Sequence, residues 1–166
     1  DRGTKITIYL NEENKEFSEL MRVKFLLQKY SQYINFPLIL NPEEGEPETI
    51  NDSEAIWLKS KRSVKADEYN EFYKFISYDS NDPLTWMHNK VEGKQEYSSL
   101  LFIPEKSPYD LWNRDTPRGI KLFIQRVFIM DDAAHFLPLY LRFVKGVVDS
   151  SDLPLNVSRE LLQDHP

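Results

Sequence analysis

Cysteine is absent from this chain of 166 residues. A chain without cysteine has no disulfide scaffold, no thiolate nucleophile and no cysteine-bound metal. The three histidines, His88, His135 and His165, are scattered, and no pair has the spacing of metal ligands. We therefore expect no metal site. The lack of cysteine also fits a reducing compartment, and we expect a cytoplasmic protein.

Glycine and long apolar runs are scarce as well. No two of the five glycines are close in the sequence, which excludes a glycine-rich phosphate-binding loop. No stretch approaches the roughly 18 apolar residues of a membrane span. A net charge of −6 and a pI near 5.2 further disfavour nucleic acid and an anionic membrane surface as partners.

The negative charge is concentrated in one short segment. Six acidic residues and no basic residue lie between Glu43 and Glu54, among prolines and a glycine that disfavour regular structure. The other 21 acidic residues balance the 21 basic ones, so the exclusion of nucleic acid depends on the lack of a visible basic cluster. We interpret residues 42–54 as a solvated linker between two folded blocks, 1–41 and 55–166. An acidic motif for a basic partner is the less favoured alternative.

The first block has the pattern of a strand, a helix and a second strand. Apolar residues alternate with polar ones over Thr4–Leu10, which predicts a strand at the start. Ser18 is a suitable N-cap for a helix, and Phe36–Leu40 is a short apolar run typical of an edge strand. The predicted inward face of the helix consists of Val23, Leu27, Tyr30 and Ile34.

The second block alternates helices with strands. Asp67 opens a helix whose apolar face is formed by Tyr69, Phe72, Tyr73 and Ile76. Ile120–Met130 is apolar on both faces, as expected of a central strand. The fold class is therefore α/β (α+β), a layered α-β-α sandwich with a mixed sheet, preceded by the strand-helix-strand remnant. The remaining predicted elements are strands His88–Gln95, Tyr97–Ile103 and Phe143–Asp149, a helix over Ala133–Leu141, and a terminal helix.

Arg159 is the most informative candidate for a functional residue. Ser158 is a good N-cap, so Arg159 falls in the first helical turn, where a cation opposes the helix dipole. One interpretation is an arginine paired with Glu160 or another acid. The other is an anion site, since free N–H groups and a guanidinium together suit a phosphate, with Asn156 and Gln163 as polar support.

Two tryptophans lie in polar surroundings. Trp86 follows Asn-Asp-Pro-Leu-Thr, and Trp112 lies in Tyr-Asp-Leu-Trp-Asn-Arg. Packing in the core is the favoured interpretation for each, and an exposed anchor for another protein is the alternative.

Long motifs in the chain resemble the ninety-kilodalton heat-shock protein chaperones. The resemblance covers nearly the whole chain, except the acidic segment, where the family has a variable charged linker. Two shorter phrases, at residues 82–86 and 112–115, are similar to the bacterial form of the family. The motifs are Gly3-Thr-Lys-Ile-Thr-Ile-Tyr-Leu10, the run from Asn89 to Pro104, Phe128-Ile-Met-Asp-Asp, and the run from Tyr140 to Gln163.

This resemblance implies a place in a larger protein. Residues 1–41 are similar to the tail of an N-terminal nucleotide-binding domain, and residues 55–166 to the first subdomain of a middle domain. The parent protein would be an ATP-dependent, homodimeric chaperone that remodels unfolded or partly folded client proteins. Its partners would include the N-terminal ATPase domain of the same chain. Mg-ATP would be bound by the parent, and we expect none on this segment, because the family's ATP-pocket motifs are missing from it.

The resemblance also implies roles for single residues. Arg159 falls on the arginine that reaches the γ-phosphate of ATP, and Asn156 and Gln163 match its polar partners. Phe128 matches an apolar position at the domain interface, and Thr4 matches a threonine of the adenine-binding network.

An alternative function stays open beside this one. The chain would then be a protein-binding module in which the loops around Trp86 and Trp112 hold client, and Arg159 would be structural. In either case we expect residues 1–41 to be mobile or ordered by pairing with another molecule, because their first strand has no partner in the chain.

Overall fold

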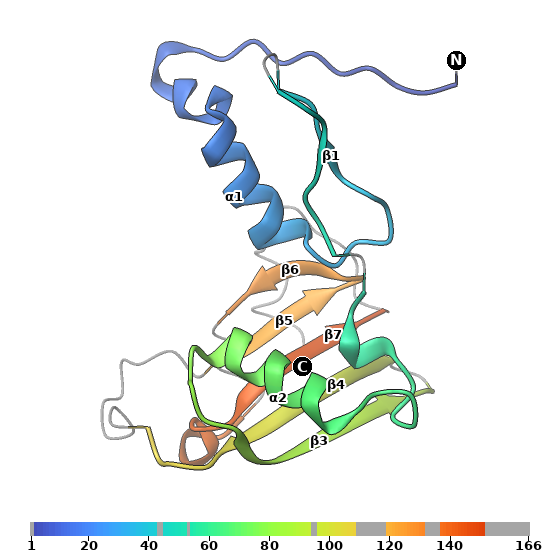
Figure 1. Cartoon of the computed structure of the whole chain (residues 1–166), viewed down its shortest axis with the longest axis vertical. Helices are drawn as coiled ribbons and strands as arrows, with labels where there is room; N and C mark the ends of the chain where they lie inside the picture. The colour runs from blue at the N-terminus through green and yellow to red at the C-terminus, as the bar shows by residue number, and fades with distance from the viewer. Residues whose placement is uncertain are drawn as a thin grey trace.

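The computed structural model describes residues 2–42, 45–52, 54–93, 96–108, 119–131 and 137–151. One helix and a small hairpin stand above a five-stranded sheet, and a second helix crosses the face of that sheet (Figure 1). The α-helices are α1 (Leu20–Ser31) and α2 (Ala66–Ser77), and the 3-10 helices are η1 (Glu12–Ser18), η2 (Ile56–Leu58) and η3 (Leu139–Leu141). The strands are β1 (Ile39–Leu40), β2 (Glu48–Thr49), β3 (Pro83–Val91), β4 (Tyr97–Pro104), β5 (Ile120–Ile124), β6 (Val127–Met130) and β7 (Lys145–Ser150).

The five-stranded sheet has the order β3-β4-β7-β5-β6. Strands β5 and β7 are parallel, and the other neighbouring pairs are antiparallel. The last strand of the chain to be described, β7, thus lies in the middle of the sheet. This arrangement confirms the predicted α+β class with a mixed sheet.

Helix α2 covers one face of the sheet. It begins with an exposed turn in which the Lys65 N–H donates to Glu68 Oε1 at 3.0 Å, and its buried side is formed by Tyr69, Tyr73 and Ile76. The helix predicted from Asp67 is confirmed, with its start one residue earlier. The buried layer beneath it includes Trp57, Leu100, Phe102, Phe123 and Val147.

The opposite face of the sheet has its own apolar layer. It consists of side chains from β5, β6 and β7 and from part of the segment 137–144. The described part of the helix predicted over Ala133–Leu141 is only a 3-10 turn, η3. The predicted terminal helix lies outside the described residues. The buried members of this layer are Ile120, Leu122, Ile124, Ile129, Val144 and Val148.

The prediction of one long strand over Ile120–Met130 is wrong, because the chain reverses within it. Gln125 and Arg126 have φ angles of 49° and 67° and form a tight turn between β5 and β6. Two successive left-handed residues are typical of a type I′ hairpin turn, which usually contains asparagine and glycine. The sequence has neither residue at this turn, and hydrogen bonds from distant parts of the chain hold it instead.

The beginning of the chain also differs from the prediction. Thr4–Leu10 contains no strand, and Figure 1 shows the segment as an extended trace. Ile6 and Ile8 are 80% and 76% exposed, because no described strand lies in register beside them. Ser18 does not cap α1. It ends η1, where its hydroxyl donates to the Lys15 carbonyl at 2.7 Å.

The acidic segment contains more structure than a solvated linker. Strand β2 pairs with β1 in an antiparallel hairpin, and Ile50 beyond it is only 7% exposed. The Asn51 side chain accepts a hydrogen bond from Leu38 N–H at 2.7 Å and donates to the Phe36 carbonyl at 2.8 Å. The expectation that the prolines and the glycine of this segment disfavour regular structure is therefore wrong for β2. At the open end of the hairpin, the side chain of Asn51 adds to the backbone bond between Ile50 and Leu38.

Candidate functional site

The predicted anion-site residues, Arg159, Asn156 and Gln163, lie outside the described residues, as does Trp112. What the structure describes is the point from which the chain continues toward them, the end of β7 at Ser150. Contacts from three other parts of the chain hold this strand end in place.

A buried carboxylate organises the end of β7. Asp149 is 5% exposed, and its Oδ2 accepts a hydrogen bond from the Trp57 indole N–H at 2.8 Å. Its Oδ1 accepts from the backbone N–H of Arg126 at 3.2 Å. Burial raises the pKa of the Asp149 carboxyl, while these two hydrogen bonds and the charge of Arg126 act in the opposite direction. The carboxylate thus joins η2, the β5–β6 turn and β7.

The β5–β6 turn is fixed against the same strand end. The Gln125 N–H donates to the Ser150 carbonyl at 2.9 Å, and its side-chain amide donates to the Ser151 carbonyl at 3.4 Å. The guanidinium of Arg126 donates to Asn35 Oδ1, just beyond the end of α1. These bonds account for the two left-handed residues, because the turn is held from outside rather than by its own sequence.

The other side of β7 is fixed by the beginning of β4. The Ser151 N–H donates to the Glu96 carbonyl at 3.1 Å, and the Ser151 hydroxyl donates to the same oxygen at 3.2 Å. The chain therefore leaves β7 from a point that is held by hydrogen bonds on both flanks.

A cleft of about 450 Å³ opens at this end of the sheet. Its walls come from the ends of β3 and β7, the start of β4 and the β5–β6 turn, and they bring charges of both signs together. Such a mixed lining favours neither a simple anion nor a simple cation. The charged side chains in the lining are Lys90, Glu92, Glu96, Arg126 and Asp149.

Phe128 and Trp86 lie at opposite edges of the sheet. Phe128, on β6, is 8% exposed, and its ring centroid is 5.8 Å from that of Tyr30 on α1. Trp86, on β3, is 36% exposed and stacks on Tyr69 of α2 at 5.0 Å. The third described candidate, Thr4, is exposed in the segment before η1. The structure therefore does not bring these three candidates together.

His88 is buried beneath α2 and has a structural role. Its Nε2 lies 2.9 Å from the Trp57 carbonyl, which can only accept, so Nε2 carries the proton. In the neutral ring Nδ1 then accepts from the Tyr69 hydroxyl at 2.7 Å. Both ring nitrogens are thus used within the core. Among the residues that the structure describes, no three potential acidic, histidine or cysteine ligands cluster around a metal position.

Sequence reasoning missed Asp149, Arg126 and Asn35. Asp149 lies at the end of a predicted strand, where aspartates commonly cap or turn the chain. The available signal was its place directly after Val147 and Val148 in a strand apolar on both faces, where an acid requires buried partners. The partner Trp57 is 92 residues away in the sequence, so no local pattern could have identified it.

Comparisons with known proteins all point to one family of relatives for this chain. Residues 41–166 match the family model described as Hsp90 protein. The proteins named chaperone protein HtpG from Salmonella typhimurium and Citrobacter koseri are 57% and 56% identical to it. The HtpG of Escherichia coli O9:H4 is 56% identical. Each alignment covers 99% of this chain and 27% of the relative, so the chain spans about a quarter of the length of these proteins. No helix in the described ranges is long and apolar enough to cross a membrane.

Proposed function

This chain belongs to the Hsp90 family, and on that premise we propose that it couples ATP hydrolysis to the remodelling of client proteins in an ATP-dependent chaperone. Residues 1–41 would be the tail of an N-terminal ATPase domain, 42–54 a linker, and 55–166 the first part of a middle domain. The observation that carries the proposal is the family match, which includes Arg159. Unfolded proteins and a second copy of the chain would be partners, in the cytoplasm.

Arg159 would act on ATP bound by the ATPase domain. When water attacks the γ-phosphorus and the bond to the ADP oxygen breaks, negative charge accumulates on the transferred phosphoryl group. A guanidinium placed at that group stabilises this charge more in the transition state than in the ground state. Asn156 and Gln163 would orient the guanidinium through hydrogen bonds.

The anchored end of β7 supports this role. An arginine that acts on a ligand of another domain needs a fixed origin, because small displacements cost much of its effect. Asp149 and Ser151 join β7 to η2, to the β5–β6 turn and to the start of β4. The contact between Phe128 and Tyr30 supports a link between this sheet and α1, which would belong to the ATPase domain.

Two features of the described residues favour ATP binding by another part of the full-length protein. Thr4, the described residue that the resemblance assigns to adenine binding, is exposed, and the charged cleft at the end of β7 has a mixed lining. The proposal therefore assigns ATP binding to the ATPase domain and only the contact with its γ-phosphate to this chain.

The test is Arg159→Ala in the full-length protein. We expect ATP turnover to fall substantially while the affinity for nucleotide changes little. An arginine finger is worth on the order of 10³-fold or more in rate. We expect a smaller loss, because domain closure rather than chemistry often limits such enzymes.

Two further variants make the test specific. Arg159→Lys retains the charge but not the planar fork, so it should recover only part of the turnover. Arg62→Ala removes an exposed arginine elsewhere on the chain and should leave turnover unchanged. Normal turnover in Arg159→Ala would contradict the proposal and favour the alternative that the chain only binds client.

A further inference from the structure

The five-stranded sheet has two edges that differ in cover. At one edge lies β6, of four residues, where Phe128 and Ile129 are buried and α1 packs alongside through Tyr30. At the other edge lies β3, of nine residues, which borders the sheet in Figure 1. Long edge strands without cover are rare in proteins, because they pair readily with other chains.

The first half of β3 is exposed on both of its faces. Four successive residues from Leu84 to Met87 are exposed, although side chains of a strand alternate between the two faces. Leu84 is 67% exposed and Met87 57%, whereas Trp86 is 36% exposed and rests on Tyr69. This stretch contains apolar side chains and one threonine, and it contains no charge.

The backbone of β3 is paired on one side only. Its register with β4 runs from Pro83 to Val91, with an irregularity at Leu84. Among the described residues, no other backbone hydrogen bond reaches β3. Since alternate residues of an antiparallel edge strand turn their N–H and C=O groups outward, half of these groups face away from the sheet.

The devices that protect this edge lie toward the ends of β3, and they include the irregularity in pairing at Leu84. Pro83 stands at its start, and Lys90 lies near its end, where the Lys61 ammonium also donates to Asn89 at 3.4 Å. The sequence from Leu84 to Met87 contains neither a charged residue nor a proline. The stretch from Thr85 to Met87, beyond the irregularity, is therefore unprotected, and it presents the apolar side chains of Trp86 and Met87.

We propose that the outer edge of β3 binds an extended apolar segment of a partly folded protein by strand addition. Outward N–H and C=O groups in a row can be satisfied together only by another extended backbone. Leu84, Trp86 and Met87 present apolar surface beside this edge, so the bound segment would be apolar as well. Such segments are accessible in unfolded chains and buried in folded ones, which gives selectivity for partly folded proteins.

This inference depends on the proposed function only for the source of the segment, the client protein. The test measures amide hydrogen exchange in the 166-residue chain, with and without reduced and carboxymethylated α-lactalbumin, a permanently unfolded protein. We expect binding to slow the exchange of every second amide between Leu84 and Val91, because only outward N–H groups gain a partner.

Matched lysine variants identify the edge. Met87→Lys places a charge on the edge strand beside the added strand, and we expect it to weaken binding about tenfold, which corresponds to about 1.4 kcal/mol. Leu84→Lys should act in the same direction, so the conclusion does not depend on one variant. Met21→Lys makes the same change at a methionine of α1 that is 76% exposed and should leave the affinity unchanged. Circular dichroism checks that each variant is folded.

Three results would overturn the proposal. The first is unchanged exchange in β3 on binding, and the second is slowing of all its amides alike, which indicates contact without strand addition. The third is alternate protection in the chain alone that grows with its concentration, which indicates pairing with a second copy. None of these results depends on ATP turnover, so failure here is distinguishable from failure of the role of Arg159.

Discussion

Helices α1 and α2 have the same length of 12 residues but bury very different amounts of their apolar surface. Helix α1 has no buried residue, and its Met21 and Phe25 are 76% and 54% exposed. Helix α2 buries Tyr69, Tyr73 and Ile76. Both sequences contain an apolar stripe at helical spacing, so this pattern alone does not decide whether a helix is buried.

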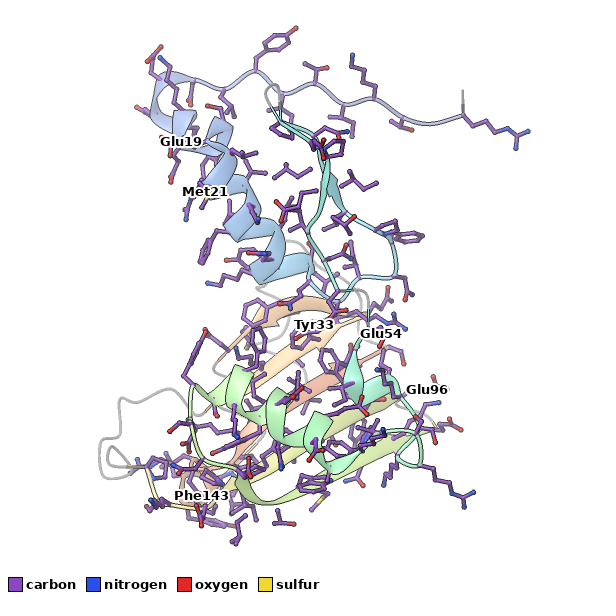
Figure 2. All side chains as sticks on the ribbon, in the orientation of Figure 1. Glu19, Met21, Tyr33, Glu54, Glu96 and Phe143 are labelled. Carbon is purple, nitrogen blue, oxygen red and sulfur yellow. The ribbon has the colours of Figure 1, made fainter. Side chains whose placement is uncertain are left out.

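The difference lies in what each helix packs against. Helix α2 lies across the sheet, whereas α1 stands beside a two-stranded hairpin and reaches the sheet only at its end (Figure 1). Figure 2 shows Tyr33 at that junction and Met21 on the part of α1 away from the sheet. Tyr33 is 8% exposed, and its ring centroid lies 4.7 Å from that of Trp57. The stability of the first region therefore depends on a small contact, and that of the second on a continuous layer.

The largest expected effect tests this comparison directly. Tyr73 is 1% exposed, its ring lies 5.4 Å from Phe102, and its hydroxyl donates to Asp79 at 3.0 Å. Tyr73→Ala removes a whole ring from the core, and we expect the free energy of unfolding to fall by about 3–5 kcal/mol. Chemical denaturation followed by circular dichroism measures the change.

Phe25→Ala is the matched change in α1. It truncates an aromatic side chain that is already half exposed, so we expect a loss of less than about 1 kcal/mol. A loss in Phe25→Ala as large as in Tyr73→Ala would mean that α1 is packed as firmly as α2, and would contradict the comparison.

The sequence predicted best where local pattern and tertiary packing agree. The apolar stripe of α2 and the short strand at β4 are examples, since each faces the core in the way its pattern indicates. The long strand over Ile120–Met130 failed for the opposite reason. Gln125 and Arg126 adopt left-handed conformations because Asp149, Ser150 and Asn35 bind the turn from distant parts of the chain.

In the acidic segment, too, local composition fails to predict the structure. Its composition indicates a solvated linker, yet Asn51 bonds to the backbone just before β1 and Ile50 is buried. A single asparagine among acids carries no visible signal for this role. For the candidate site, Phe128 and Trp86 were named from the sequence, whereas the buried network at Asp149 required the fold, because its members meet only there.

A smaller effect concerns the junction between the two regions and depends on pH. Burial raises the pKa of the Tyr33 hydroxyl from its usual 10.0 to about 12, with a further contribution from the negative charge of Asp52. Between these values the unfolded chain has released the proton and the folded chain retains it. Stability is therefore fully present below pH 10 and is lost as the pH rises toward 12.

Tyr33→Phe removes the hydroxyl that titrates. The free energy of unfolding should therefore fall less at high pH in this variant, by on the order of 2 kcal/mol. Denaturation midpoints from pH 9 to pH 12 measure it, with the exposed Tyr140→Phe as control. Equal slopes in the wild-type chain and in Tyr33→Phe would show that the junction is open to solvent, and the two regions would then be independent.

The smallest expected effect concerns the ion pair that joins α1 to the hairpin. The Lys24 ammonium lies 2.7 Å from Glu48 Oε1, and both side chains are partly exposed. Glu48→Gln should cost about 0.2–1 kcal/mol, because partly solvated pairs are screened by water and salt. The cost should shrink further in high salt, and the matched change Glu92→Gln, which removes an exposed pair with Lys90 on the sheet, should cost no more. A cost above that range that persists in high salt would mean that this pair is a principal contact of α1. Helices α1 and α2 would then differ in the kind of contact that holds them, polar for α1 and apolar for α2. They would not differ in how strongly they are held.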